Sequence, residues 1–142
     1  AHEQAAWFIE NVPKVRGDLP PILDMEWNHL SPTCTLRPPA AEVRASIREF
    51  SRIVARHYGT APLIYTTPDF YERNDLGSLR GVEFWLRSVK AHPNERYPNE
   101  RWSFWQYSGT GLVPGVGGPV DLNAFGGSRQ AWQVWLSQRS QG

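Results

Sequence analysis

The sequence predicts an α/β fold built on a largely parallel sheet. In its first half, short apolar runs typical of strands are separated by a segment with helical periodicity, the usual pattern of parallel strands joined by helices. In its second half, the expected strands follow one another with loops between them. A length of 142 residues, with 40% hydrophobic and 20% charged residues, suits a single folded domain with its own core.

The expected helices are 1–12, 39–58, a short helical turn at 67–73, and a closing helix that begins at Ser128. Pro13 ends the first helix because proline cannot continue the helical hydrogen-bond pattern. The second helix presents an apolar stripe, and Gly59 after it suits a left-handed helix end. Ser128 is a favourable N-cap. Trp132 and Trp135 in the closing helix are expected to lie in the core.

The expected strands are 20–28, 63–66, 82–86, 102–107 and 120–124, and the segments 91–101 and 109–119 are expected to be loops. Each strand segment is short and rich in apolar or aromatic residues, whereas the loop segments carry prolines and glycines. The first strand contains Ile22, Leu23 and Met25 after a Pro-Pro entry, and this composition predicts a buried strand.

Two carboxylates interrupt this first strand. Side chains alternate along a strand, so Asp24 and Glu26 point to one face while Leu23 and Met25 point to the other. At about 3.3 Å per residue, the two acids begin about 6.6 Å apart at the backbone, within the range in which carboxyl pairs act on a glycosidic bond. The alternative interpretation is a strand end whose acids reach solvent or pair with arginines.

Other strands also end in polar or aromatic groups. In α/β folds, functional groups gather at the carboxyl ends of parallel strands. Here the strand ends carry Glu26, Tyr65-Thr66, Trp85, Gln106-Tyr107 and Asp121-Asn123. This convergence favours a catalytic role for Asp24 and Glu26 over the alternative.

Composition excludes several classes of function. A net charge of +1 gives no electrostatic case for binding nucleic acid, and no apolar run approaches the ~20 residues that span a bilayer. Cys34 is the single cysteine, so an internal disulfide and a cysteine metal site are excluded. The histidines lack metal-ligand spacing, and the glycine-rich loop lacks the features of a phosphate-binding loop. We therefore expect no metal and no cofactor.

Five motifs, each weak alone, occur in this sequence in a specific order over nearly its whole length. They are Leu23-Asp24-Met25-Glu26, Pro62-Leu63-Ile64-Tyr65-Thr66, Phe84-Trp85-Leu86, Trp102-Ser103-Phe104-Trp105-Gln106-Tyr107-Ser108-Gly109 and Val120-Asp121-Leu122-Asn123. In this order they resemble glycoside hydrolase family 25, the Chalaropsis-type lysozymes or N-acetylmuramidases, which include many phage endolysins.

The resemblance implies a TIM-like (β/α)5β3 barrel that cleaves the β-1,4 bond between N-acetylmuramic acid and N-acetylglucosamine in peptidoglycan. By motif, Glu26 resembles the catalytic acid/base and Asp24 the carboxylate that orients the substrate acetamido group or stabilises positive charge. Asp121 resembles a further active-site acid. The groups expected to line the sugar cleft are Tyr65, Trp85 and Gln106, with Trp27 and Asn123 beside them.

The family opens with strands that have no counterpart here. Residues 1–142 therefore resemble the carboxyl-terminal two-thirds of a family 25 catalytic domain, an incomplete barrel without its first strands. Open strand edges need a partner, so we expect pairing with an amino-terminal segment or a second chain. A peptidoglycan substrate implies a protein that is secreted, periplasmic or delivered to the cell wall by a phage.

Three other interpretations are compatible with the same residues. The first is a non-catalytic peptidoglycan- or glycan-binding fragment that holds a sugar through its aromatics, Gln106 and Asn123. The second is a metal-binding α/β domain that uses Asp24, Glu26 and Asp121. The third, a chitinase-like barrel, is disfavoured because the sequence lacks a longer acidic series. The sequence leaves open a retaining, inverting or substrate-assisted course.

Overall fold

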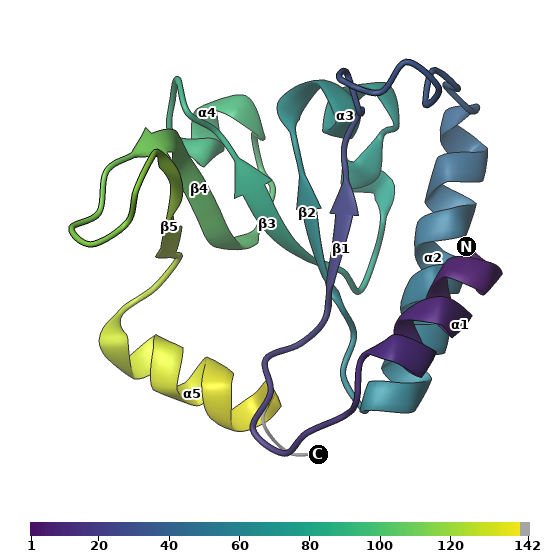
Figure 1. The fold of residues 1–142 in the computed structure, drawn as a ribbon, viewed down its shortest axis with the longest axis horizontal. Coiled ribbons are helices and arrows are strands. Elements are labelled where there is room, and N and C mark those ends of the chain that lie inside the picture. Colours follow the sequence, from purple (N-terminus) through teal and green to yellow (C-terminus); the bar gives the residue numbers. More distant parts are fainter. Residues whose placement is uncertain (140–142) are drawn as a thin grey trace.

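The computed structural model describes residues 1–139, in which five strands form one sheet (Figure 1). The strands are β1 Ile22–Met25, β2 Leu63–Thr66, β3 Glu83–Arg87, β4 Trp102–Gly111 and β5 Val120–Phe125, and they lie side by side in this order. β1 to β4 are parallel, whereas β5 runs antiparallel to β4. The prediction of an α/β fold with a largely parallel sheet is therefore confirmed.

Within residues 1–139 the sheet is open, and β1 and β5 form its two edges. The edge position of β1 corrects the expectation of a buried strand. Leu23 and Met25 are partly buried against the core, whereas Ile22 and Asp24 on the opposite face are exposed. The expectation failed because apolar content alone does not distinguish a central strand from an edge strand with only one covered face.

The helices are α1 His2–Asn11, α2 Ala40–Tyr58, α3 Pro68–Arg73, the 3₁₀ turn η1 Leu76–Ser78, α4 Pro93–Arg96 and α5 Arg129–Arg139. Figure 1 shows α1 and α2 side by side beyond β1, whereas α5 lies apart from them, below β5. No helix in residues 1–139 combines the length and the apolar character needed to cross a bilayer.

Two details of the middle of the chain differ from the sequence prediction. The segment 91–101, expected to be a loop, contains α4, whose first turn is capped by His92: its Nδ1 accepts a hydrogen bond from the Asn94 backbone at 3.2 Å. The turn η1 was not predicted either, because elements of three or four residues are too short to show helical periodicity. β4 extends to Gly111 because β5 pairs with it that far.

The α2 helix forms as its apolar stripe predicts. Val43, Ile47 and Val54 on this stripe are buried, and Gly59 ends the helix in the left-handed conformation with φ of 81°. α1 packs against α2 through edge-to-face contacts of the Phe8 ring, and the Tyr58 hydroxyl of α2 donates to the Val12 carbonyl at 2.7 Å. The contact between the two helices is thus both apolar and hydrogen-bonded.

The two faces of the sheet differ in polarity because side chains alternate along each strand. The face beneath α2 and α3 carries the apolar positions Leu23, Met25, Ile64, Phe84 and Leu86, which form the main core cluster with residues of those helices. The other face carries Asp24, Tyr65 and Trp85, which are partners in register across β1, β2 and β3. Folding the apolar face into the core therefore leaves a row of polar and aromatic side chains on the opposite face.

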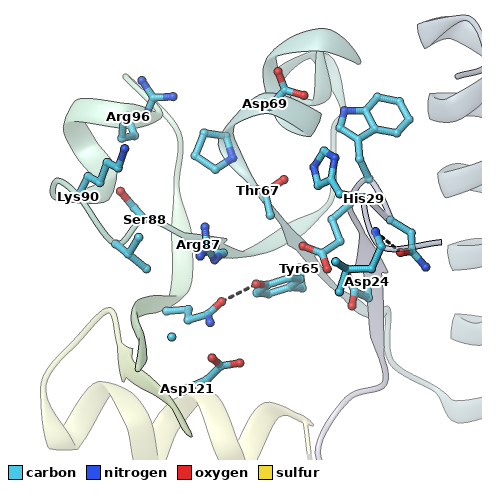
Figure 2. Close-up of a pocket in the computed structure, with 18 residues that line it drawn as sticks. Asp24, His29, Tyr65, Thr67, Asp69, Arg87, Ser88, Lys90, Arg96 and Asp121 are labelled. Carbon is cyan, nitrogen blue, oxygen red and sulfur yellow. Dashed lines mark hydrogen bonds between the residues drawn. The ribbon is translucent and has the colours of Figure 1, made fainter. Parts of the chain in front are cut away.

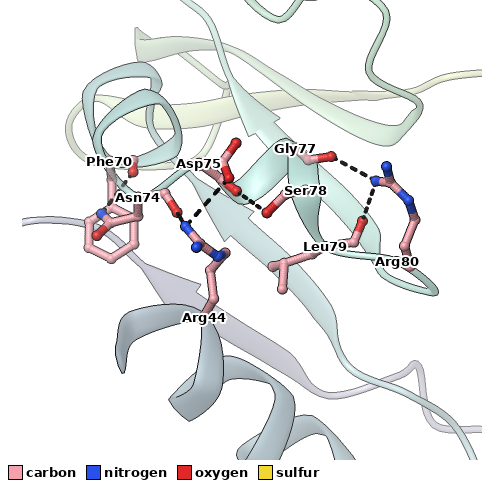
Figure 3. Close-up of polar contacts among 8 residues, drawn as sticks. All are labelled: Arg44, Phe70, Asn74, Asp75, Gly77, Ser78, Leu79 and Arg80. Carbon is pink, nitrogen blue, oxygen red and sulfur yellow. Dashed lines mark hydrogen bonds and ion pairs between the residues drawn. The ribbon is translucent and has the colours of Figure 1, made fainter. Parts of the chain in front are cut away.

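A polar network fastens the turn after α3 to α2 (Figure 3). Arg44 of α2 donates to the Asn74 carbonyl at 2.7 Å and forms an ion pair with Asp75 at 3.5 Å. The buried Asn74 side chain donates to the Phe70 carbonyl at 2.9 Å, and Ser78 donates to the Asp75 carbonyl at 2.8 Å. The network ties the end of α3 and the turn after it to α2, and the Arg44 bond satisfies the Asn74 carbonyl just beyond the helix.

The closing helix α5 is held to the sheet by aromatic packing and one carboxylate. Trp132 and Trp135 stack at 5.3 Å, and both contact Phe104 of β4, so their predicted core position is confirmed for the buried Trp135, while Trp132 is partly buried. The Glu83 carboxylate of β3 accepts hydrogen bonds from Ser103, from Trp135 Nε1 at 2.5 Å and from Arg139. Glu83 thus joins β3, β4 and α5.

This arrangement predicts acid-sensitive stability. Burial raises the pKa of Glu83, but the hydrogen bonds from Ser103, Arg139 and Trp135 outweigh it and leave the pKa below its ordinary value of 4.5. Glu83 therefore stabilises the fold above pH 4.5, and this contribution is lost as the pH falls through the lower folded-state pKa. We expect Glu83→Gln to lose about 1–3 kcal/mol at neutral pH, and the difference from the wild type to shrink in acid.

Urea unfolding of both proteins between neutral pH and pH 3 measures this difference. Glu10→Gln, which replaces an exposed carboxylate on α1, is the matched control. Parallel stability curves for the wild type and Glu83→Gln over the whole pH range would contradict the assignment.

Candidate functional site

A cavity of about 1290 Å³ opens at the carboxyl ends of β1, β2 and β3 (Figure 2). We call it the site cavity. Four groups of residues line it: the acids Asp24, Glu26, Asp69 and Asp121, the basic residues His29, Arg87, Lys90 and Arg96, the polar or aromatic residues Trp27, Asn28, Tyr65, Thr67, Ser88 and Gln106, and the small or apolar residues Leu30, Pro68, Val89 and Gly109. Acidic and basic side chains thus share one open cavity.

Strand register explains how distant residues meet here. Asp24 of β1 is paired with Tyr65 of β2, and Arg87 of β3 is paired with Gln106 of β4. Glu26 follows β1 directly and lies two positions after Asp24, so the two carboxyl groups reach the same cavity as predicted. The sheet itself therefore sets the spacing of the site.

Asp121 reaches the site cavity from the amino end of its strand, and not from the carboxyl end that the sequence predicts. The reason is that β5 runs antiparallel to β4. The hairpin that joins β4 and β5 brings this amino end to the same edge of the sheet as the carboxyl ends of the parallel strands. Its Oδ1 lies 3.5 Å from the position that a Cβ atom on Gly109 would occupy.

Most of the predicted site residues lie together. The site cavity is lined by Asp24, Glu26, Asp121, Tyr65, Gln106 and Trp27. Trp85 and Asn123 are not among its lining residues. They are hydrogen-bonded to each other, with the Trp85 Nε1 donating to the Asn123 side-chain oxygen at 2.9 Å, and the Trp85 ring makes an edge contact with Tyr65 at 5.7 Å. They therefore lie next to the cavity wall.

Tyr65 and Gln106 are fixed by each other. The Tyr65 hydroxyl donates to the side-chain oxygen of Gln106, whose side chain is buried with a residue exposure of 3%. Burial, followed by the negative charge of Glu26, raises the pKa of Tyr65 to about 12, so the hydroxyl stays protonated at neutral pH. Because the Gln106 oxygen is engaged, its amide NH₂ group, 4.0 Å from the Cβ position of Gly109, is oriented to donate inside the cavity.

The charges around Glu26 favour its protonated form. Burial raises the pKa of Glu26, the neighbouring Asp24 and the more distant Asp121 raise it further, and Arg87 and His29 oppose this shift. Burial also raises the pKa of Asp24. A carboxyl group that holds its proton above the usual pH range is suited to act as a general acid. Because Asp24 and Glu26 interact, they titrate as a pair.

Sequence reasoning missed the basic residues of the site cavity, above all Arg87. The strand containing Trp85 was expected to end at Leu86, whereas β3 continues to Arg87. Extending the two-residue alternation by one more step would have placed Arg87 on the same face as Trp85. Asp69, Lys90 and Arg96 come from the segments after β2 and β3, and strand periodicity carries no signal for them.

The structure offers no metal site among the carboxylates. In the part of the chain that the structure describes, no three His, Cys, Asp or Glu side chains lie close enough together to hold a metal ion. Asp24, Glu26 and Asp121 therefore do not form the donor set that the metal-binding alternative requires.

The electrostatics of the site predict that removing the charge of Asp24 shifts the pKa of Glu26. Since the Asp24 carboxylate raises the pKa of Glu26, Asp24→Asn is expected to lower that pKa. Carbon-13 NMR titration of the side-chain carboxyl of Glu26 measures this shift. Glu10→Gln on the exposed face of α1 should leave the titration unchanged. An unchanged or higher Glu26 pKa in Asp24→Asn would contradict the described geometry.

Comparisons with known proteins point to one family. The sequence model of Glycosyl hydrolases family 25 matches residues 1–116. The chain is 33% identical over 140 residues to "Uncharacterized protein YegX" of Escherichia coli K12, covering 96% of this chain and 47% of that protein. It is 34% identical over 137 residues to "Lysozyme M1" of Streptomyces globisporus, covering 88% of this chain and 45% of that protein.

A solved structure agrees with the sequence matches. The structure of a family 25 glycosyl hydrolase from Bacillus anthracis superposes with a TM-score of 0.80 at 29% identity, covering 94% of this chain and 61% of that one. The chain thus spans about half the length of the curated relatives it matches.

Proposed function

The chain belongs to glycosyl hydrolases family 25, and from this premise we propose that it is a peptidoglycan hydrolase that cleaves the β-1,4 bond between N-acetylmuramic acid and N-acetylglucosamine. The observation that carries the proposal is the meeting of Asp24, Glu26 and Asp121 in one open cavity together with Tyr65 and Gln106. Carboxyl groups at short separation beside hydrogen-bond donors are what glycosidic bond cleavage requires.

In the proposed reaction, Glu26 is the acid/base that protonates the leaving glycosidic oxygen. Its raised pKa supports this role, because a general acid must carry a proton at the start of the reaction. Asp24 is the carboxylate that orients the acetamido group of the substrate or stabilises the positive charge that develops on the sugar. The same pair is compatible with attack by water, by a carboxylate or by the acetamido oxygen.

The remaining residues hold the saccharide. Gln106 and the Tyr65 hydroxyl supply the polar contacts, and the Trp27 ring supplies an apolar surface at the cavity edge. Trp85 and Asn123 contribute indirectly. The Trp85 ring contacts Tyr65 and its Nε1 donates to Asn123, so the pair holds Tyr65 in position. We assign Asp121 as a further active-site acid, whose negative charge contributes to the raised pKa of Glu26.

The proposal includes the barrel context. Parallel strands with helices on one face and functional groups at their carboxyl ends are the arrangement of a (β/α)5β3 barrel. The exposed edge of β1 is the place where further strands, from an amino-terminal segment or a second chain, would pair and continue the sheet.

A second candidate is a non-catalytic peptidoglycan- or glycan-binding fragment. Asp24 and Glu26 are both exposed in the described residues, and exposure weakens the desolvation on which a catalytic acid depends. Tyr65, Gln106 and Trp27 would hold a sugar equally well without hydrolysis.

Glu26→Gln tests the choice between these two candidates. We expect this substitution to lower the rate of peptidoglycan hydrolysis by at least about 10²-fold, because it removes the proton donor of the first step. Loss of turbidity of a peptidoglycan suspension measures hydrolysis, and co-sedimentation with the same material measures binding.

The control is Glu42→Gln, which alters an exposed acid on α2 and should leave hydrolysis unchanged. Hydrolysis that persists in a folded Glu26→Gln protein would refute the assignment of the acid. Co-sedimentation without any hydrolysis by the unaltered protein would favour the binding fragment.

A further inference from the structure

Arg87 lies inside the site cavity with no partner for its guanidinium group. In Figure 2 it lies between Tyr65 on one side and Ser88 and Lys90 on the other. The residue is partly buried, and within residues 1–139 no oxygen accepts a hydrogen bond from its guanidinium and no carboxylate lies within ion-pair distance. Because the cavity is open, water reaches the guanidinium, and its hydrogen-bond donors are available to a ligand.

Backbone hydrogen bonds, rather than the Arg87 side chain, hold the end of β3 in place. The Arg87 carbonyl accepts from the buried Tyr97 hydroxyl at 2.7 Å, and the Ser88 amide donates to the Gln106 carbonyl at 3.0 Å. Both contacts would survive a change of the Arg87 side chain. The guanidinium is therefore presented to the cavity from a rigid backbone.

The positive charges of the site cavity come largely from one segment of the chain. Asp24 and Glu26 come from β1 and the residue after it, whereas Arg87, Lys90 and Arg96 come from the end of β3 and the segment that follows it. Arg96 is paired with Glu72 at 3.6 Å, which leaves Arg87 and Lys90 without an ion pair in the described part of the chain. Asp121 lies near Arg87, since its Oδ1 is 3.5 Å and the Arg87 Nη2 is 4.0 Å from the Cβ position of Gly109, but the two form no ion pair within residues 1–139. The side of the cavity formed by the end of β3 therefore carries positive charge that no ion pair neutralises.

We infer that Arg87 binds a carboxylate group of the substrate, and thereby decides which sugar lies on the basic side of the scissile bond. The planar guanidinium matches a carboxylate with two parallel hydrogen bonds, and the Asp24 carboxylate repels the same group. This inference rests on the proposed function, because it treats the ligand of the site cavity as a saccharide that carries carboxylates.

Peptidoglycan supplies such a carboxylate from two sources. One is the lactyl ether of N-acetylmuramic acid when no peptide is attached, and the other is the stem peptide. A chitin oligosaccharide has the same β-1,4 linkage and acetamido groups but no carboxylate. Arg87 therefore separates these ligands by charge alone, whereas Tyr65, Gln106 and Trp27 contact features that all of them share.

The experiment measures binding in the Glu26→Gln protein, so that the ligands stay intact. Dissociation constants are obtained by calorimetry for chitotetraose, for a peptide-free tetrasaccharide of alternating N-acetylglucosamine and N-acetylmuramic acid, and for the same tetrasaccharide with stem peptides. Adding Arg87→Gln should weaken binding of a carboxylated ligand about tenfold or more, with less than about twofold change for chitotetraose. Arg87→Lys should retain part of the preference, because it keeps the charge but loses the paired hydrogen bonds.

Arg56→Gln, which removes an exposed charge on α2, is the matched control and should change none of the constants. Thermal melting of each variant checks that it is folded. The ligand whose affinity falls identifies the source of the carboxylate, whether lactyl group or stem peptide.

An equal loss for all three ligands, no loss for any, or no binding of carboxylated ligands by the folded Glu26→Gln protein would overturn the inference. Failure of the enzymatic proposal gives a different result: no hydrolysis by the unaltered protein, with the Arg87-dependent preference in binding preserved.

Discussion

The alternation of side chains across in-register parallel strands is the constraint on which the rest of this structure depends. Because α2 and α3 cover one face of the sheet, alternate residues of β1 to β3 face the core, among them the apolar Leu23, Ile64 and Phe84. The intervening positions point to the opposite face. Asp24 and Tyr65 occupy them, and register places them side by side. The apolar core thus fixes which face of the sheet carries Asp24 and Tyr65, two residues of the site cavity.

Side-chain hydrogen bonds, and not burial alone, hold the residues of the opposite face of the sheet in position. Tyr65 and Gln106 bond to each other across β2 and β4, and Trp85 bonds to Asn123 across β3 and β5. These pairs satisfy polar groups that would otherwise be costly so close to the sheet. Within residues 1–139 the carboxyl groups of Asp24, Glu26 and Asp121 form no ion pair, which keeps them available to a ligand.

The site differs electrostatically from an ordinary acidic cleft. Asp24 and Asp121 raise the pKa of Glu26, while Arg87 lowers it. The guanidinium therefore moderates the proton affinity of the acid and, by our inference, recognises the substrate as well. Both effects follow from one backbone position at the end of β3, where Tyr97 and the neighbouring strand hold the chain rigidly.

The sequence by itself determined the α/β fold class, the bounds of β2 and the apolar stripe of α2, because these depend on local periodicity. It also predicted, from motif order, that Asp24, Glu26 and Asp121 lie together, and the three line one cavity. Only the tertiary structure decided that β5 is antiparallel to β4 and that Arg87, Lys90 and Arg96 reach the same cavity as the acids. The direction of β5 depends on how the loop 112–119 turns back onto β4, and the positions of Lys90 and Arg96 depend on the segment after β3, for which strand alternation gives no signal.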